Sequence, residues 1–263
     1  MQDRHLDRER YFSESAESSE NYYIPFIRFD RSQPRPARIL EIGCGEGGNL
    51  KPFAEMGCQV TGVDIVSCRI EQARQFFEAR NLSGDFQCCD FMSYRVPETE
   101  AERFDVILLH DVIEHITDKE PFVQRIRAFL KADGVLFVAF PAWYMPFGGH
   151  QQICRNKLWS KVPFLHLLPN AVYTFLLKTP AREKQTTIDE LLYIKRCRTT
   201  VELFEKLVKR CGLRVVRRQL WLINPHYRQK FGLKPRKLSP ILEKIPYVRN
   251  FLATSCFYLL RAS

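Results

Sequence analysis

A glycine-rich turn is the most constraining feature of this 263-residue sequence. Four glycines lie between positions 43 and 48, after an apolar strand predicted at 38–42 and before a helix predicted at 49–56. Glycines allow a sharp turn and let a ligand approach the backbone, and the start of the helix offers free N–H groups to an anionic ligand group. Asp64 ends the next predicted strand, where a carboxylate can accept hydrogen bonds from both hydroxyls of a ribose. The turn therefore predicts an α/β domain that binds a nucleotide-like ligand.

Strands and helices alternate along most of the chain. Strands are predicted at 38–42, 59–63, 86–89, 104–109 and 134–140, with helices at 49–56, 68–80 and 119–130. A helix at 201–211 and strands at 213–222 and 255–260 follow later. The last two strands have no helix between them, which predicts an antiparallel pair. We expect an α/β fold: a doubly wound, mostly parallel seven-stranded sheet with a C-terminal antiparallel hairpin, plus a helical insertion.

Two segments lie outside this alternation. Residues 1–36 are charged and then aromatic, which predicts an N-terminal helical extension before a main domain at 37–263. Residues 152–198 are rich in aromatic, proline and basic residues and interrupt the strand–helix order. This composition favours a lid-like insertion over an apolar substrate, or helices at an anionic membrane interface. An accessory helical cap packed on the sheet is the alternative.

The glycine turn alone leaves the ligand open. Gly43, Gly45 and Gly48 formally fit the G-x-G-x-x-G pattern of dinucleotide-binding domains, and Asp64 fits the acidic position of that pattern. A NAD-linked oxidoreductase is therefore a competing interpretation.

Several motifs in the expected order resemble class I (Rossmann-like) SAM-dependent methyltransferases, where SAM is S-adenosylmethionine. Glu41-Ile-Gly-Cys-Gly-Glu-Gly47 resembles motif I of that family, and Asp90 with Phe91 follows the third strand as it does there. His110-Asp-Val-Ile-Glu-His115 after the fourth strand and Phe129-Leu-Lys-Ala-Asp-Gly134 before the fifth are also similar to the family. The resemblance covers roughly residues 38–141 and 199–261 and favours SAM over a nicotinamide cofactor.

The resemblance implies residues that would hold the methionyl part of SAM. The backbone at Gly43, Cys44 and Gly45 would line it, and Glu41 would lie near its amino group, directly or through water. His110 would border the same end of the cofactor.

The resemblance also implies residues for the nucleoside. Asp64 would hold the ribose, and Ile65 would pack on the adenine. Asp90 would accept a hydrogen bond from the adenine amino group, and Phe91 would cover the ring. A helix cap is the alternative for Asp90, and a core position is the alternative for Phe91 and Ile65.

Two histidines are candidate catalytic residues. His150, in Phe147-Gly-Gly-His-Gln-Gln152, resembles a Gly-His segment that many family members have near the acceptor. His115 follows Glu114 where a helix is expected to open, and a local hydrogen bond is its alternative. Histidine suits a general base, so we expect O-methylation of an acceptor that must lose a proton. The nine cysteines are scattered without a CxxC pair, and no metal site is predicted.

Charge is unevenly divided along the chain. Residues 1–150 hold 17 Lys and Arg against 24 Asp and Glu, a net charge of −7, whereas residues 151–263 hold 23 against 6, a net charge of +17. A basic half predicts an anionic partner. We expect a small-molecule or lipid- or glycan-linked anionic acceptor, with nucleic acid disfavoured because no RNA-binding signature accompanies the basic cluster at 228–237. A tRNA methyltransferase and a non-catalytic SAM-binding protein stay open as alternatives.

The sequence also predicts where the protein works. Residues 1–20 are charged and lack the apolar core of a secretory signal. The most apolar stretch, 162–177, contains two prolines and is shorter than the ~20 residues of a spanning helix. We expect a cytoplasmic protein whose basic, aromatic insertion is a candidate for peripheral membrane contact.

Overall fold

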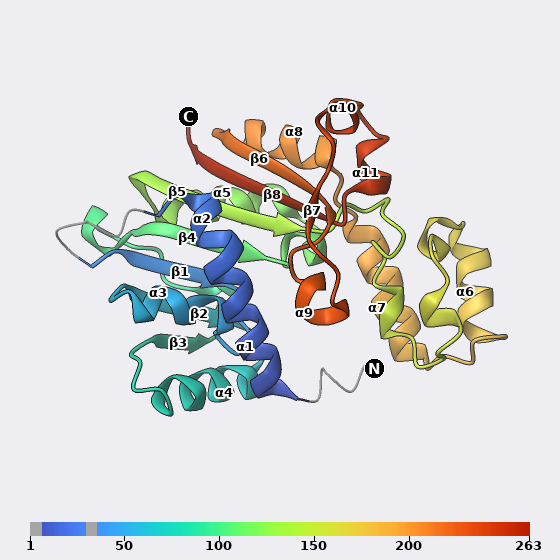
Figure 1. The fold of residues 1–263 in the computed structure, drawn as a ribbon, viewed down its shortest axis with the longest axis horizontal. Helices are drawn as coiled ribbons and strands as arrows, with labels where there is room; N and C mark the ends of the chain where they lie inside the picture. The colour runs from blue at the N-terminus through green and yellow to red at the C-terminus, as the bar shows by residue number, and fades with distance from the viewer. Residues whose placement is uncertain (1–6, 30–35) are drawn as a thin grey trace.

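An eight-stranded mixed sheet forms the centre of the computed structural model, which describes residues 7–29 and 36–263 (Figure 1). The strand order is β3-β2-β1-β4-β5-β8-β6-β7. The strands are β1 (Arg38–Ile42), β2 (Gln59–Asp64), β3 (Asp85–Cys88), β4 (Phe104–His110), β5 (Leu130–Phe140), β6 (Leu213–Ile223), β7 (Arg236–Lys237) and β8 (Ser255–Ala262).

The pairing confirms the predicted doubly wound, mostly parallel sheet. β1 pairs in parallel with β2 and β4, β2 with β3, and β4 with β5. β8 is antiparallel to both β5 and β6. The predicted count of seven strands is wrong by one, because the two-residue β7 pairs with β6 and is too short to leave a periodic pattern in the sequence.

The strand order reverses between β1 and β4. The chain runs outward from β1 to β2 and β3, then returns to place β4 on the other side of β1. In an open α/β sheet, the crevice outside the carboxyl ends of the strands at such a switch point is where ligands bind. Gly43 follows β1 and Asp111 follows β4, so both lie at this crevice.

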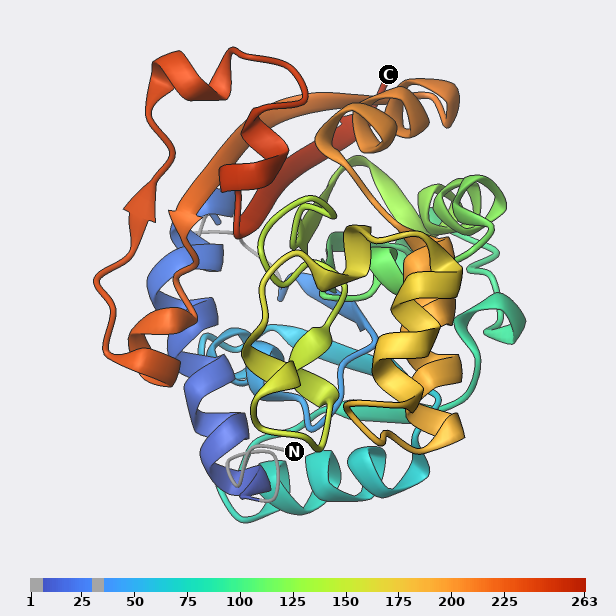
Figure 2. The same ribbon diagram turned by 90° about the vertical axis from the view of Figure 1, so that its right-hand side faces the viewer.

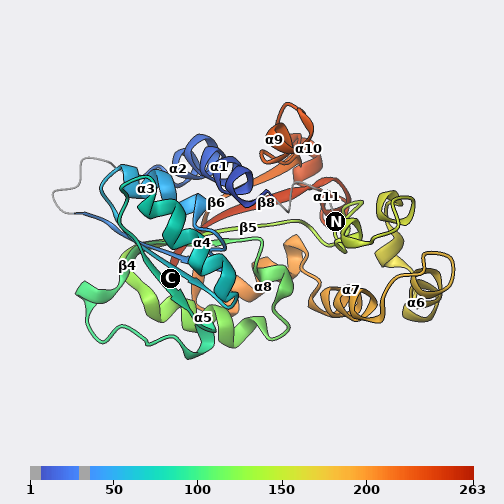
Figure 3. The same ribbon diagram turned by 90° about the horizontal axis from the view of Figure 1, so that it is seen from below.

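Helices cover both faces of the sheet (Figure 3). Along β4, Ile107 and Leu109 belong to one buried cluster and Val106 and Leu108 to the other, because successive side chains of a strand point to opposite faces. One face carries α5 (Lys119–Phe129) and α8 (Val201–Arg210). The other carries α1 (Arg8–Ser18), η2 (Ser19–Tyr23), α2 (Ile24–Ile27), α3 (Lys51–Glu55) and α4 (Ser67–Glu78).

The N-terminal extension is helical from Arg8 to Ile27, and a π-helical turn joins α1 to α2. Phe12 is fully buried. The helix packs directly on the glycine turn: a Cβ added at Gly48 would lie 2.5 Å from the carbonyl oxygen of Phe12. Only glycine allows this approach, so α1 forms one wall of the crevice. The rest of the predicted extension, residues 1–6 and 30–35, lies outside the described residues.

The segment after β5 folds into short helical turns and two longer helices, α6 (Asn170–Lys178) and α7 (Gln185–Cys197). In Figure 2 it lies in front of the sheet, in yellow. It has a small core of its own, which includes Tyr173, Leu177 and Leu191. A function as a lid stays a prediction. None of the helices within residues 7–29 and 36–263 combines the length and hydropathy needed to cross a bilayer.

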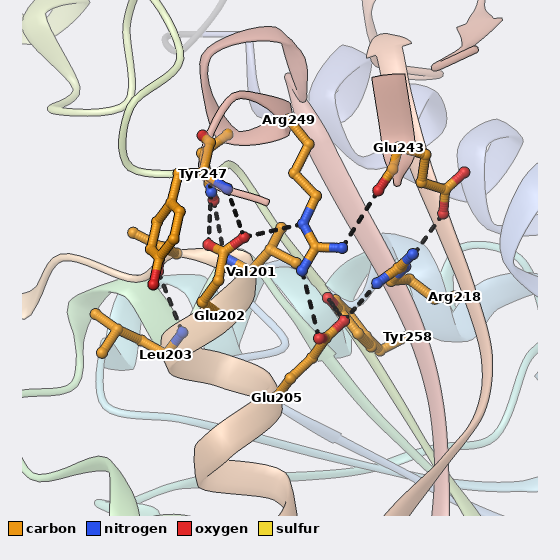
Figure 4. Close-up of polar contacts among 11 residues, drawn as sticks. Val201, Glu202, Leu203, Glu205, Arg218, Glu243, Tyr247, Arg249 and Tyr258 are labelled. Carbon is orange, nitrogen blue, oxygen red and sulfur yellow. Dashed lines mark hydrogen bonds and ion pairs between the residues drawn. The ribbon is translucent and has the colours of Figure 1, made fainter. Parts of the chain in front are cut away.

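The chain between β6 and β8 forms three short helices, α9 (Tyr227–Phe231), α10 (Pro240–Glu243) and α11 (Arg249–Leu252). A network of charged side chains ties the end of this segment to α8 (Figure 4). The buried Arg249 guanidinium lies 3.0 Å from Glu202 and 3.4 Å from Glu205. Glu202 also accepts hydrogen bonds from Asn250 at 2.6 Å and from the Tyr247 amide at 2.9 Å. The network holds the segment in place beside the crevice.

Candidate functional site

The glycine turn after β1 is built from residues in the left-handed region. Gly43 has φ 73° and Gly45 has φ 52°. A Cβ at Gly43 would lie 2.4 Å from Cγ2 of Val112, whereas a Cβ at Gly45 would meet no described atom within 4 Å. The amides of Gly43 and Cys44 donate to the carbonyl oxygen of Val63 at 2.8 and 3.1 Å. Gly43 is thus required by packing, and the backbone at Gly45 borders open space.

Asp64 joins this turn to the end of β2. Its side chain is buried, and Oδ2 accepts from the Gly45 amide at 2.9 Å while Oδ1 accepts from the Val66 amide at 2.9 Å. A carboxylate can accept about four hydrogen bonds, so about two acceptor positions remain for ligand hydroxyls. The sequence indicated a ribose-binding carboxylate here; the structure adds that the same group positions the turn.

Glu41 lies behind the turn with only 1% of its surface exposed. Oε1 accepts from Nδ2 of Asn49 at 2.6 Å, and Oε2 has no partner among the residues that the structure describes. Burial raises the pKa of Glu41 to about 8, opposed by the Asn49 hydrogen bond and assisted by the negative charge of Asp64. The carboxyl group is therefore neutral at pH 7 in the free protein.

Two cavities meet at the crevice. The first, of about 100 Å³, lies between the glycine turn and α1 and is lined by Tyr11, Phe12, Ser15, Gly43, Cys44, Gly45, Glu46, Gly48, Asn49, Arg69, His110 and Asp111. The second, of about 390 Å³, shares Tyr11, Arg69 and Asp111 with the first and extends to Met145, His150 and the 224–230 segment. The two cavities are therefore neighbours, with these three side chains between them.

The predicted nucleoside residues follow β2 and β3. Ile65 is 72% exposed, so it is free to contact a ligand. Asp90 is exposed and caps a short 3₁₀ turn by accepting from the Met92 amide at 2.9 Å, which matches its cap alternative and leaves Oδ2 available. Phe91 fits its core alternative: its ring is buried against Phe122 and Phe129, with centroids 5.6 and 4.9 Å away.

His110 and Asp111 close the crevice at the end of β4. The His110 ring lies beside Tyr23, with centroids 5.2 Å apart, and lines the first cavity; its contact with a cofactor stays a prediction. Asp111 has φ 52°, which is uncommon for a residue other than glycine, and its amide donates to the Ala139 carbonyl at 2.9 Å. Such backbone strain is often found at functional sites. Asp111 lines both cavities and was missed, although it lies inside the 110–115 motif.

His115 and His150 lie side by side although 35 positions separate them. Their ring centroids are 4.8 Å apart at 81°. Burial lowers the pKa of His115, and it lowers that of His150 to about 4, with His115 adding to the effect. Both rings are thus neutral at pH 7.

Glu114 completes this cluster and was not predicted. It is 4% exposed, and within residues 7–29 and 36–263 neither carboxylate oxygen has a hydrogen-bond partner. Burial raises its pKa well above the usual range. One ligand atom from each of Glu114, His115 and His150 lies within 4.8 Å of the others. These side chains come from two separate segments, after β4 and after β5, so no spacing in the sequence predicts that they meet.

The second cavity is rich in basic groups. Arg8, Arg69, His226 and Lys230 all line it. Arg8 pairs with the buried Glu46 at 3.0 Å, and Arg69 lies 4.0 Å from the same carboxylate. His226 and Lys230 come from the basic half of the chain, whereas Arg8 and Arg69 come from the acidic half and share the Glu46 carboxylate. An anionic acceptor stays a prediction.

Residues 40–138 match the family model described as "Methyltransferase domain". Among curated proteins, the ubiquinone biosynthesis O-methyltransferase of Bradyrhizobium sp. (strain ORS 278) is 38% identical over 103 residues, which are 39% of this chain and 39% of that protein. That of Bartonella tribocorum (strain CIP 105476 / IBS 506) is 34% identical over 123 residues, 45% of this chain and 49% of that protein. The chain thus spans less than half the length of these curated relatives.

The fold is also similar to that of solved methyltransferases. Magnesium protoporphyrin IX methyltransferase from Synechocystis PCC 6803, solved with bound SAH, aligns with 95% of this chain and 84% of its own, with a TM-score of 0.56 and 13% identity. At this identity the likeness concerns the fold alone. Residues 40–138 are thus similar in sequence to a methyltransferase domain, and the fold over most of the chain is similar to that of a solved methyltransferase.

Proposed function

We propose that this chain binds SAM in the first cavity and transfers its methyl group to an acceptor in the second. The observation that carries the proposal is the glycine turn fixed by Asp64, beside a cavity that shares lining residues with a larger one. The family match over residues 40–138 favours this function over a NAD-linked oxidoreductase. The open backbone at Gly45 and the remaining acceptor positions of Asp64 supply what a SAM molecule needs at the turn.

The proposed cofactor contacts begin at the first cavity and extend beyond its lining residues to the ends of β2 and β3. The backbone at Gly43, Cys44 and Gly45 lines the methionyl part, with Glu41 behind it and His110 at its border. Asp64 accepts from the ribose hydroxyls, while the exposed Ile65 and Asp90 contact the adenine.

The proposed reaction is O-methylation, the chemistry that the names of the curated relatives give for those proteins. The acceptor oxygen attacks the methyl carbon in line, the sulfur–carbon bond breaks, and S-adenosylhomocysteine leaves as a neutral thioether. The acceptor proton must leave as well. The protein mainly positions the two molecules and excludes water. We assign this proton to the neutral imidazole of His150, with His115 beside it, because His150 lines the second cavity and its ring touches that of His115.

The proposed acceptor is a small or lipid-linked molecule with an anionic group, which Arg69, Arg8 and Lys230 would attract. For a lipid-linked acceptor, the insertion would contact an anionic membrane surface. Leu158 and Phe175 are 72% and 60% exposed there, next to the basic Lys157 and Lys178. Flotation with anionic vesicles at low salt tests this part, and failure to float would reject membrane contact.

Calorimetric titration with SAM, S-adenosylhomocysteine and NADH tests the function. We expect SAM and S-adenosylhomocysteine to bind and NADH not to bind. Asp64→Ala should weaken SAM binding by about tenfold to a hundredfold, roughly 1.5–3 kcal/mol, because a charge-assisted ribose contact is lost. Asp64→Asn keeps the volume and one acceptor oxygen and should lose less. Asp133→Ala, an exposed carboxylate far from the turn, serves as the control. NADH binding without SAM binding would overturn the proposal.

A further inference from the structure

The cluster of Glu114, His115 and His150 lies at the edge of the second cavity, which His150 helps to line. Two imidazoles and one carboxylate are ligands for a divalent transition metal ion such as Zn²⁺, Mn²⁺ or Fe²⁺, whereas Mg²⁺ and Ca²⁺ prefer oxygen alone. We propose that these three side chains bind one divalent transition metal ion.

The distances fit one ion after a small adjustment. The three ligand atoms lie within 4.8 Å of one another. Metal–ligand bonds of about 2.0–2.2 Å in tetrahedral geometry place two ligand atoms of one ion about 3.4 Å apart. Closing the gap from 4.8 Å requires each ligand atom to move by less than about 1 Å, which rotation of the rings and the carboxylate provides.

The carboxylate gives independent support. Glu114 is buried, and both of its oxygens lack a hydrogen-bond partner within the described parts of the chain. Burying a carboxyl group without partners is costly, and the cost is removed when the group binds a cation. The nearby Lys119 does not fill this role, because its ammonium group donates to the carbonyl oxygens of Ile116 and Cys197.

The backbone holds both histidines in place before any ion binds. His150 has φ 57°, a left-handed conformation, and its amide donates to the Phe147 carbonyl at 3.0 Å. Gly149 fixes this loop, since a Cβ there would lie 2.2 Å from the Cβ of His166. On the other side, the His115 carbonyl accepts from the Tyr193 hydroxyl at 3.1 Å, so α7 packs on the turn that carries it.

Three protein ligands leave coordination positions open for water or a substrate oxygen. An acceptor hydroxyl bound to the ion would lose its proton to solvent water more readily, since a divalent cation stabilises the oxygen anion. The two imidazoles would then act on the acceptor through the ion and not by taking the proton themselves. This role in catalysis rests on the proposed function; the binding of the ion does not.

The test is metal binding to the full chain after chelator treatment. Co²⁺ is added and its visible ligand-field absorption recorded, and the Zn²⁺ affinity is measured in competition with a chromophoric chelator. We expect one ion per chain, and an affinity at least about tenfold weaker in His150→Ala and Glu114→Gln. The matched control His226→Gln removes another imidazole of the same cavity and should bind like the wild type.

Two further measurements keep the outcomes distinct. Thermal unfolding with and without Zn²⁺ reports on folding: the ion should raise the midpoint of the wild type and of His226→Gln, and not that of the two cluster variants. SAM titration on the same samples separates this inference from the proposed function. SAM binding with no stoichiometric metal, or with unchanged metal affinity in His150→Ala, overturns the metal site alone. Metal binding without SAM binding overturns the proposed function alone.

Discussion

Replacing Glu41 with glutamine tests whether the carboxyl group behind the glycine turn is protonated in the free protein. The side chain is 1% exposed and only one of its oxygens has a hydrogen bond, from Asn49, among the described residues. Burial raises its pKa from 4.5 to about 8. Glutamine has nearly the same shape and keeps an oxygen for Asn49, but it never ionises. The substitution therefore removes the titration and leaves the packing.

The sign and size of the effect follow from the raised pKa. The folded protein keeps a proton that the unfolded chain loses above about pH 4.5. The stability linked to this group is fully present below pH 4.5 and is lost as the pH rises through 8. Each pH unit in this window costs up to about 1.36 kcal/mol, and roughly two such units lie between pH 6 and 8. Between pH 6 and 9, we expect wild-type stability to fall by about 2–3 kcal/mol more than that of Glu41→Gln.

Urea unfolding of the SAM-free protein at pH 6, 7, 8 and 9 measures this difference. Because other groups also titrate, the comparison is between variants at each pH and not between pH values for one protein. Glu55→Gln, on the exposed side of α3, is the matched control and should follow the wild type. Parallel pH profiles for wild type and Glu41→Gln would show that the carboxyl group is already ionised at pH 6, and the argument from its burial would be refuted.

Three further substitutions test the packing around the crevice. Gly43→Ala should lower the free energy of unfolding by roughly 2–4 kcal/mol in urea titration, because it combines a positive φ with a contact on Val112. The added Cβ of Gly45→Ala meets open space, so this substitution should lower the free energy of unfolding by only roughly 1–2 kcal/mol. The same variant should weaken SAM binding in calorimetry by more than this loss of stability explains. Arg249→Met leaves Glu202 without its buried cation and should destabilise by roughly 3–5 kcal/mol with SAM affinity unchanged, and an unchanged urea midpoint would contradict this account.

The sheet and the turn could be predicted because their signals are local in sequence. Each apolar strand is short and ends at a turn residue, and the alternation with helices leaves few possible topologies. The strand predicted at 86–89 is observed at Asp85–Cys88, a boundary shift of one residue. β7 was not predicted because a strand of two residues is too short to show an alternation of apolar and polar side chains.

Burial of a single apolar residue could not be predicted in the same way. Phe91 follows β3 where the family resemblance placed an adenine contact, yet its ring packs on Phe122 and Phe129. Whether an aromatic ring at a strand end faces a ligand or the core depends on how close α5 lies. That distance is set by tertiary packing, which a residue pattern does not contain.

The cluster of Glu114, His115 and His150 could not be predicted from the sequence for a different reason. It depends on His150, which follows β5, meeting a turn that follows β4. The meeting requires a left-handed conformation at His150, and histidine has only a weak intrinsic preference for it. Asp111 also has a left-handed backbone conformation, which the sequence pattern does not predict. The Ala139 carbonyl of the neighbouring strand β5 stabilises it by accepting from the Asp111 amide.

The first cavity is lined mostly by residues within the range of the family match, and the second mostly by residues outside it. The cofactor turn and the end of β4 lie within residues 40–138, the range of the family match. Most of the second cavity lies outside that range, from Arg8 on α1 through Met145 and His150 to Lys230 on α9. The family match therefore covers most of the proposed cofactor site, and most of the proposed acceptor site lies outside it. The charges of these segments, and not the names of the relatives, are the reason to expect an acceptor with an anionic group.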